Sequence, residues 1–161
     1  MRDVTENKPR PSYAGNMSHT FAHNLVHCVF GTKDRLNQIK NPEQLWRYVA
    51  GLAHAKNIHV VAAGGTSNHL HLLILLPQTI TLAKAMQELK ANTSRWLRKT
   101  SSTFRWQEGY GAFSVSQSQR VTVMEYIANQ EEHHRTRSFE QEFAAMLEKS
   151  GISYDPRYVF G

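Results

Sequence analysis

The sequence predicts an α+β protein with a ferredoxin-like fold, an antiparallel sheet with helices packed on one face. Three observations support this prediction: the elements follow the order β-α-β-β-α-β, the two middle strands form a hairpin, and helices follow the last strand. One of these C-terminal helices carries a tyrosine, Tyr126. Because this fold serves many functions, it leaves the chemistry open.

The first half of the predicted fold consists of a strand and a helix. Residues 18–32 are rich in β-branched and aromatic residues and end at Gly31, which is typical of a strand. Asn41 is a good helix N-cap, because a proline follows at the first helical position and Gln44 lies three residues after the cap. Apolar residues then recur at helical spacing up to about Lys56.

A β-hairpin and a second helix follow. Residues 58–63 form a short apolar run that stops at two glycines, and residues 69–76 form a second run that a proline ends. A Gly/Ser/Asn turn joins them, which is typical of a hairpin. Residues 81–99 carry apolar side chains at helical spacing.

The last predicted elements are a strand and two helices. Residues 104–116 combine aromatic residues, two glycines and an alternating tail, which indicates an irregular strand. We expect helices at about 119–135 and at 139–149. Residues 1–16 contain two prolines and no hydrophobic period, so we expect a flexible leader before one domain at 17–161.

Composition narrows the class of protein. The 161 residues include one cysteine, Cys28, which excludes an internal disulfide and fits the cytoplasm. The longest apolar run, 70–77, is far shorter than the roughly 20 residues of a membrane span, and we expect no membrane partner. Lys and Arg outnumber Asp and Glu by 19 to 13, a charge of +6 that favours polyanions such as nucleic acid.

His69 and His71 lie two residues apart on the third predicted strand. Side chains alternate between the faces of a strand, so the two imidazoles share a face roughly 7 Å apart at Cα. Two such imidazoles can converge on one cation, and the alternative is a pair of hydrogen-bonded structural histidines. His19, His23 and His27 also share a face, but they span about 26 Å and are expected to be structural.

Tyr126, Gln130 and the pair His133–His134 fall on one polar stripe of the predicted helix 119–135. The Gln130 amide oxygen is a weak metal ligand one turn from a phenol, and the alternative is an ordinary surface helix. Basic residues interleave with aromatic ones in two further segments, where they suit phosphates and unpaired bases. The residues expected to bind DNA there are Arg95, Arg98, Lys99 and Arg105.

Three motifs together resemble a known family. The segments S-N-H-L-H-L-L-I at 67–74, G-Y-G-A-F-S-V-S at 109–116 and E-Y-I-A-N-Q-x-x-H-H at 125–134 are similar to the small HUH single-tyrosine transposases of the insertion sequence 200/605 family. The segments that begin at Met17 and at Tyr154 resemble further landmarks of that family. The resemblance covers nearly all of the chain from Met17 onward.

The resemblance implies a function and a site. His69, His71 and Gln130 would bind Mg²⁺ or Mn²⁺, and Tyr126 would be the nucleophile. Members act as dimers, sometimes with active sites shared between subunits, and cleave and rejoin single-stranded DNA at hairpin-marked ends of a mobile element. Because two imidazoles and an amide carry no charge, we expect weak Mg²⁺ binding that strengthens when DNA phosphates complete the ligands.

Two other functions are compatible with the sequence. One is a domesticated HUH nuclease that acts on genomic palindromic repeats or starts replication, which uses the same chemistry. The other is a non-catalytic ferredoxin-like module that binds nucleic acid, and its binding would survive both chelation and loss of the histidines.

Overall fold

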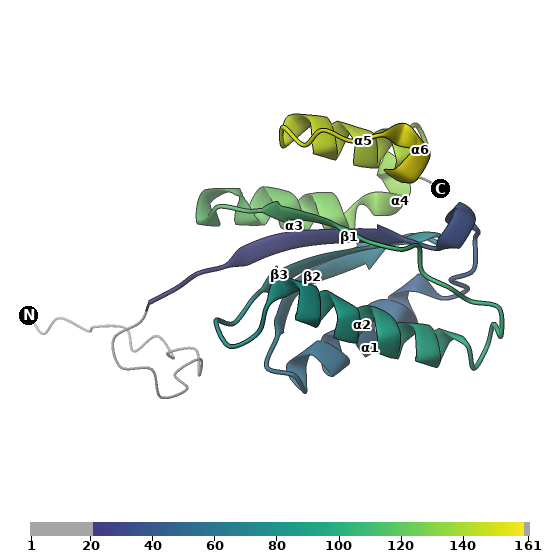
Figure 1. The fold of residues 1–161 in the computed structure, drawn as a ribbon, viewed down its shortest axis with the longest axis horizontal. Coiled ribbons are helices and arrows are strands. Elements are labelled where there is room, and N and C mark those ends of the chain that lie inside the picture. Colours follow the sequence, from purple (N-terminus) through teal and green to yellow (C-terminus); the bar gives the residue numbers. More distant parts are fainter. Residues whose placement is uncertain (1–20, 160–161) are drawn as a thin grey trace, which may run out of the picture.

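The computed structural model describes residues 21–159. Four strands form one sheet in the order β2-β3-β1-β4, with every neighbouring pair antiparallel, which confirms the ferredoxin-like prediction (Figure 1). The strands are β1 Leu25–Gly31, β2 His59–Gly65, β3 His69–Leu75 and β4 Gly111–Ser114. The helices are η1 Lys33–Arg35, α1 Pro42–His54, α2 Leu82–Leu97, η2 Gln117–Gln119, α3 Arg120–Ala128, α4 Gln130–His133, α5 Phe139–Lys149 and α6 Pro156–Val159.

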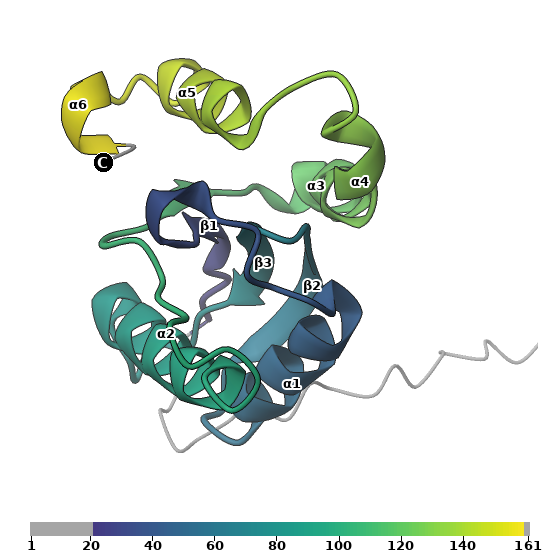
Figure 2. The same cartoon turned by 90° about the vertical axis from the view of Figure 1, so that its right-hand side faces the viewer.

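Helices cover both faces of the sheet. α1 and α2 lie on one face, while α3, α4 and α5 lie on the other (Figures 1 and 2). Successive side chains of each strand point to opposite faces of the sheet, so each strand contributes residues to both helix-covered faces. The main core lies under α1 and α2 and includes Cys28, Phe30, Leu70, Leu72, Ile74, Leu45, Val49, Met86 and Leu89.

The face under α3 has a smaller apolar cluster. Leu25 of β1, Leu73 of β3 and Ile127 of α3 are buried together, with Val123 packed against them. Val123 and Ile127 therefore hold the tyrosine helix on the sheet, as their spacing in the sequence predicts. The same face holds three buried histidines, His27, His69 and His71.

The first predicted helix begins as the sequence indicates. The Asn41 side chain accepts a hydrogen bond from the backbone N–H of Gln44, and Pro42 is the first helical residue. α1 and α2 are joined by a stacked pair of rings, Tyr48 and Trp96, with centroids 4.5 Å apart. Phe104 and Trp106 are buried in the main core, so these aromatic residues pack within the protein and are not free to stack on bases.

Several predicted boundaries are wrong. Residues 21–24 lie outside β1, and β4 is only four residues long, although Trp106 makes an isolated bridge to Thr32. β2 does not stop before its two glycines but continues through both of them. The absence of a side chain at Gly64 lets α3 approach the strand closely. The tyrosine helix breaks into α3 and α4 at Asn129, whose φ of −101° and ψ of 26° are not helical.

Two predictions fall partly outside the described residues. The expected leader at 1–16 and His19 lie there, as does the beginning of the first predicted strand. Within residues 21–159, no helix is both long and apolar enough to cross a membrane.

Candidate active site

His69 and His71 lie on β3 and point to the face covered by α3, α4 and α5. Both are completely buried, and their ring centroids are 5.1 Å apart. The sequence predicts this shared face from strand alternation alone. What the strand does not fix is the direction in which each ring nitrogen points, and that depends on neighbouring side chains.

A chain of hydrogen bonds fixes the proton of His69. The Asn68 side-chain nitrogen donates to the carbonyl of Arg35 (3.3 Å), so its Oδ1 faces His69 Nδ1 at 2.8 Å. Because an amide oxygen only accepts, His69 Nδ1 carries the proton. Burial, and then the neighbouring His71, lower the pKa of His69 to about 3, so the ring is neutral and Nε2 presents a lone pair.

His71 is oriented by a third histidine. His27, on β1, is buried, and its Nε2 lies 2.9 Å from His71 Nδ1. Burial and the nearby His71 lower the pKa of His27 to about 3, so His27 is also neutral. Among the described residues, His71 Nε2 is the buried side-chain nitrogen or oxygen atom that has no hydrogen-bond partner. His27 is therefore structural, as the sequence predicts, but its structural role is to hold a candidate ligand.

Gln130 reaches the same place from α4 and is almost completely buried. Its side-chain nitrogen donates to the carbonyl of Tyr126 (3.2 Å) and to Glu142 Oε1 (3.1 Å), which fixes the amide orientation. Its Oε1 therefore faces His69 Nε2, 3.1 Å away. Two lone pairs then point at one another with no proton between them, an arrangement that a cation would stabilise.

The donor set fits a divalent metal ion. The Gln130 amide oxygen lies 3.1 Å from His69 Nε2, the His71 ring lies next to the His69 ring, and the unpartnered Nε2 of His71 is part of this set. Imidazole nitrogen suits ions such as Mn²⁺, Co²⁺ and Zn²⁺, while amide oxygen also suits Mg²⁺. His69, His71 and Gln130, the three residues expected from the sequence, are thus brought together.

Tyr126 lies beside the histidines on the last full turn of α3. Its ring meets the His71 ring edge-on, with centroids 5.9 Å apart, and its hydroxyl donates a hydrogen bond to Glu142. Burial, and then the bond and charge of Glu142, raise the pKa of Tyr126 above its usual value. The phenol is therefore protonated in this state.

Glu142, which the sequence reasoning missed, is the central acid of the site. It lies on α5 and is 3% exposed, with His134 Nε2 2.9 Å from its Oε2. Burial opposes its ionisation, but the hydrogen bond from His134, and then the proximity of His71, lower the pKa of Glu142 well below its usual range. The sequence signal that could have identified Glu142 is its place, as a carboxylate, in the apolar stripe of Phe139, Phe143 and Met146.

The site opens to solvent through a pocket of about 330 Å³. Tyr126, His133, His134, Thr136, Arg137 and Glu142 line it. Arg137 is exposed at the rim and offers a cation to a phosphate next to the tyrosine hydroxyl. Arg137 is not predicted from the sequence, because it follows the motif in a loop.

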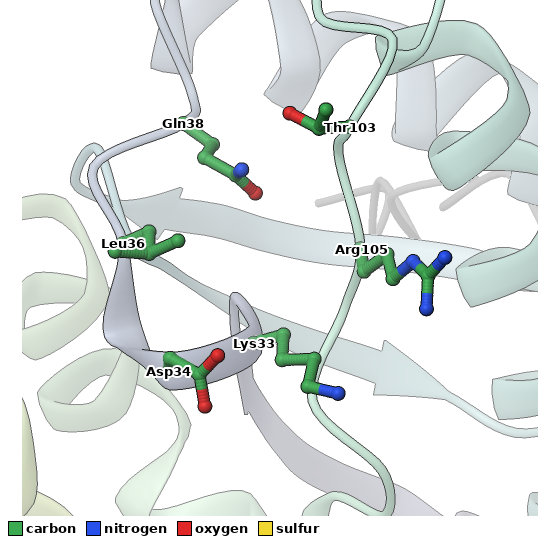
Figure 3. A pocket seen from close by; sticks show the side chains of 6 residues that line it. All are labelled: Lys33, Asp34, Leu36, Gln38, Thr103 and Arg105. Carbon is green, nitrogen blue, oxygen red and sulfur yellow. The ribbon is translucent and has the colours of Figure 1, made fainter.

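The four residues expected to bind DNA are not gathered at this site. Arg95 and Arg98 lie on or directly after α2, on the opposite face of the sheet, and Lys99 follows them. Arg98 also donates to the carbonyl of Phe104 (3.1 Å) and so holds the next loop. Arg105 lines a separate pocket with Lys33, next to η1 (Figure 3).

Comparison with known proteins identifies relatives. The family described as "Transposase IS200 like" matches residues 20–130, a range that contains His69, His71, Tyr126 and Gln130 and ends before α5. No match was found among curated proteins.

Two solved structures share the fold. A crystal structure described as a transposase from Deinococcus radiodurans R1 has 20% identity and a TM-score of 0.56, covering 72% of this chain and 96% of its own. A REP-associated tyrosine transposase bound to a REP hairpin has 12% identity and a TM-score of 0.54, covering 71% of both chains.

Proposed function

The chain belongs to the family of IS200-like transposases, and from this premise we propose that it cleaves and rejoins single-stranded DNA. Tyr126 is the nucleophile, and His69, His71 and Gln130 hold a divalent metal ion, Mg²⁺ or Mn²⁺. One observation supports the proposal: the Tyr126 ring meets the His71 ring edge-on, beside the buried side chains of His69 and Gln130, which lie 3.1 Å apart.

The reaction exchanges one phosphodiester for another. The Tyr126 oxygen bonds to phosphorus while the bond from phosphorus to the 3′-oxygen breaks, which gives a 5′-phosphotyrosine and a free 3′-hydroxyl. The proton lost by the phenol balances the proton gained by the 3′-oxygen. Because the covalent bond conserves the phosphodiester, a second 3′-hydroxyl reverses the step and joins strands.

The residues around Tyr126 have distinct tasks. Glu142 accepts the hydrogen bond of the phenol and so orients it toward the pocket. Arg137, at the pocket rim, is placed to bind the phosphate. The bound metal ion supplies positive charge that polarises the phosphate and stabilises charge on the leaving oxygen.

Each active site is assembled from one chain. Tyr126 lies against His71 of its own chain, so a partner subunit is not needed to complete the histidine site. A homodimer, which the family resemblance implies, would supply a second tyrosine for a second strand. The DNA partner we propose is a single strand with a hairpin, and the fold shared with a hairpin-bound transposase supports this choice.

The test is formation of a covalent adduct. The protein is incubated with Mn²⁺ and single-stranded DNA copied from the flanks of its gene, then run on a denaturing gel. We expect a DNA-linked band with the wild-type protein and with Tyr110→Phe, a control at an exposed tyrosine, and no band with Tyr126→Phe. A non-catalytic binding module would bind this DNA without forming the band, even after chelation.

A further inference from the structure

Two imidazole nitrogens and an amide oxygen, the ligand atoms of His69, His71 and Gln130, supply no negative charge. The charge of a divalent ion in such a buried site is therefore poorly balanced. We propose that Glu142 is a fourth protein ligand of the same ion and gives the site its negative charge. This inference rests on the metal site of the proposed function but concerns a residue on α5, beyond the range that the family match covers.

The distances fit ligands of one ion. Atoms bound at about 2.1 Å lie about 3.0 Å apart at a right angle and about 3.4 Å apart at the tetrahedral angle. Glu142 Oε1 is 3.6 Å from His71 Nε2, and Glu142 Oε2 is 3.9 Å from His69 Nε2. Shifts of a few tenths of an ångström therefore bring the carboxylate and both imidazoles to coordination distance.

The position of the carboxylate is fixed by neighbours that are independent of any metal. A capping box of Ser138 and Gln141 begins α5, and Phe139 stacks on His69 with centroids 4.6 Å apart. His134 donates through Nδ1 to the carbonyl of Arg137 (2.8 Å), while its Nε2 lies against Glu142. His134, Glu142 and His69 also have ligand atoms within 4.8 Å of one another.

The unpartnered Nε2 atom of His71 supports the same assignment. This atom is buried without a hydrogen-bond partner and faces Glu142 Oε1. At 3.6 Å the two atoms are too far apart for a hydrogen bond to each other, yet they lie side by side in a buried site. A shared cation satisfies both groups.

A carboxylate ligand changes the expected metal binding. Two imidazoles with one carboxylate are a set that favours Mn²⁺, Fe²⁺ or Co²⁺ over Mg²⁺. The negative charge also lets the ion bind firmly before DNA arrives, in contrast to the sequence-based expectation of weak binding that strengthens with DNA phosphates. Oε1, which accepts the Tyr126 hydrogen bond, is also the oxygen that faces His71 Nε2, so Glu142 would link the ion to the nucleophile.

The experiment titrates Mn²⁺ into the full-length protein without DNA and follows the EPR signal of free Mn²⁺. The variants are Glu142→Gln, the control Glu148→Gln on the exposed side of the same helix, and His71→Ala. We expect one bound ion per chain in the wild type and in Glu148→Gln. In Glu142→Gln we expect the Kd to rise at least about ten-fold, and His71→Ala should lose binding comparably.

The outcomes separate the two proposals. An unchanged Kd in Glu142→Gln beside a weakened His71→Ala overturns the role of Glu142 and leaves the histidine site intact. Failure of the wild-type protein to bind Mn²⁺ without DNA also overturns it, while the adduct assay decides the proposed function on its own.

A crystal of the wild-type protein grown with Mn²⁺ makes the test independent of variant folding. The anomalous peak should lie within about 2.3 Å of a Glu142 oxygen and of both imidazoles. A peak on the two histidines, with Glu142 still bonded to Tyr126, Gln130 and His134 and away from the ion, would exclude the ligand role.

Discussion

Glu142 on α5 accepts the hydrogen bond of the Tyr126 hydroxyl on α3, so the carboxylate and the phenol are joined although they are 16 positions apart in the sequence. Burial together with this carboxylate raises the pKa of Tyr126, and the phenol keeps its proton until a phosphate enters. Because α5 of the same chain supplies the acid, the tyrosine is held over its own histidines.

This arrangement predicts catalysis within one chain. An equal mixture of Tyr126→Phe and His71→Ala should form no covalent adduct, because each chain lacks one half of its own site. The measurement is the denaturing-gel assay with both single variants and the wild type alongside. Adduct formation in the mixture would mean that tyrosine helices are exchanged between subunits.

Gly64 sets the distance between α3 and the sheet. A Cβ at Gly64 would lie 2.1 Å from the carbonyl oxygen of Ile127, the neighbour of Tyr126. We expect Gly64→Ala to lower the free energy of unfolding by about 1–3 kcal/mol and to displace the tyrosine, with a large loss of adduct formation.

The matched control is Gly51→Ala, on the exposed side of α1, where an added Cβ meets nothing within 4 Å. It should raise the free energy of unfolding by about 0.5–1 kcal/mol and leave adduct formation unchanged. Urea unfolding measures both variants, and equal behaviour of the two would contradict close packing of α3 on β2.

His27 holds His71 in the orientation that presents Nε2 to the metal site. His27→Leu removes the hydrogen-bond partner of His71 Nδ1, and we expect Mn²⁺ binding to weaken about 10- to 100-fold, as is typical when the partner of a metal-binding histidine is lost. His27→Gln keeps an acceptor oxygen and should bind more tightly than His27→Leu. Equal affinities in both variants would assign His27 to packing alone.

The buried histidines predict that the metal-free protein loses stability in acid. The pKa values of His27 and His69 are lowered to about 3, so between about pH 6.5 and 3 the unfolded chain binds protons that the native state does not. Stability therefore falls as the pH falls through this range. The raised pKa of His134 acts in the opposite direction and offsets part of the loss.

Urea unfolding at pH 7.5 and pH 5.0, with chelator present, measures the effect. We expect the free energy of unfolding to be lower at pH 5.0 by about 2–4 kcal/mol. His27→Gln should reduce the difference, since one of the two buried imidazoles is then absent. A stability that is equal or higher at pH 5.0 would show that these rings are not held neutral.

Local patterns predict most of the fold. The Asn41 cap, the hairpin after Gly64 and the helix at 139–149 follow from capping, turn chemistry and apolar spacing, which act over a few residues. The break at Asn129 has no comparable local signal in the sequence. It goes with the tertiary packing that brings Tyr126 and Gln130 to one site.

The residues of the candidate site likewise include some that local patterns predict and others that depend on tertiary packing. Strand alternation places His69 and His71 on one face, and helical spacing relates Tyr126 to Gln130. The contributions of His27 and Glu142 depend on which strand pairs with β3 and on how α5 folds back, and both are consequences of tertiary packing.

The mass of the DNA-linked tryptic peptide tests most directly whether Tyr126 forms the covalent bond to DNA. Cleavage after Arg120 and Arg135 gives the peptide 121–135, in which Tyr126 is the single tyrosine. After nuclease trimming, we expect the added nucleotide mass on this peptide when Mn²⁺ is present. Nucleotide mass on peptide 106–120, which contains Tyr110, with peptide 121–135 unmodified, would contradict the account.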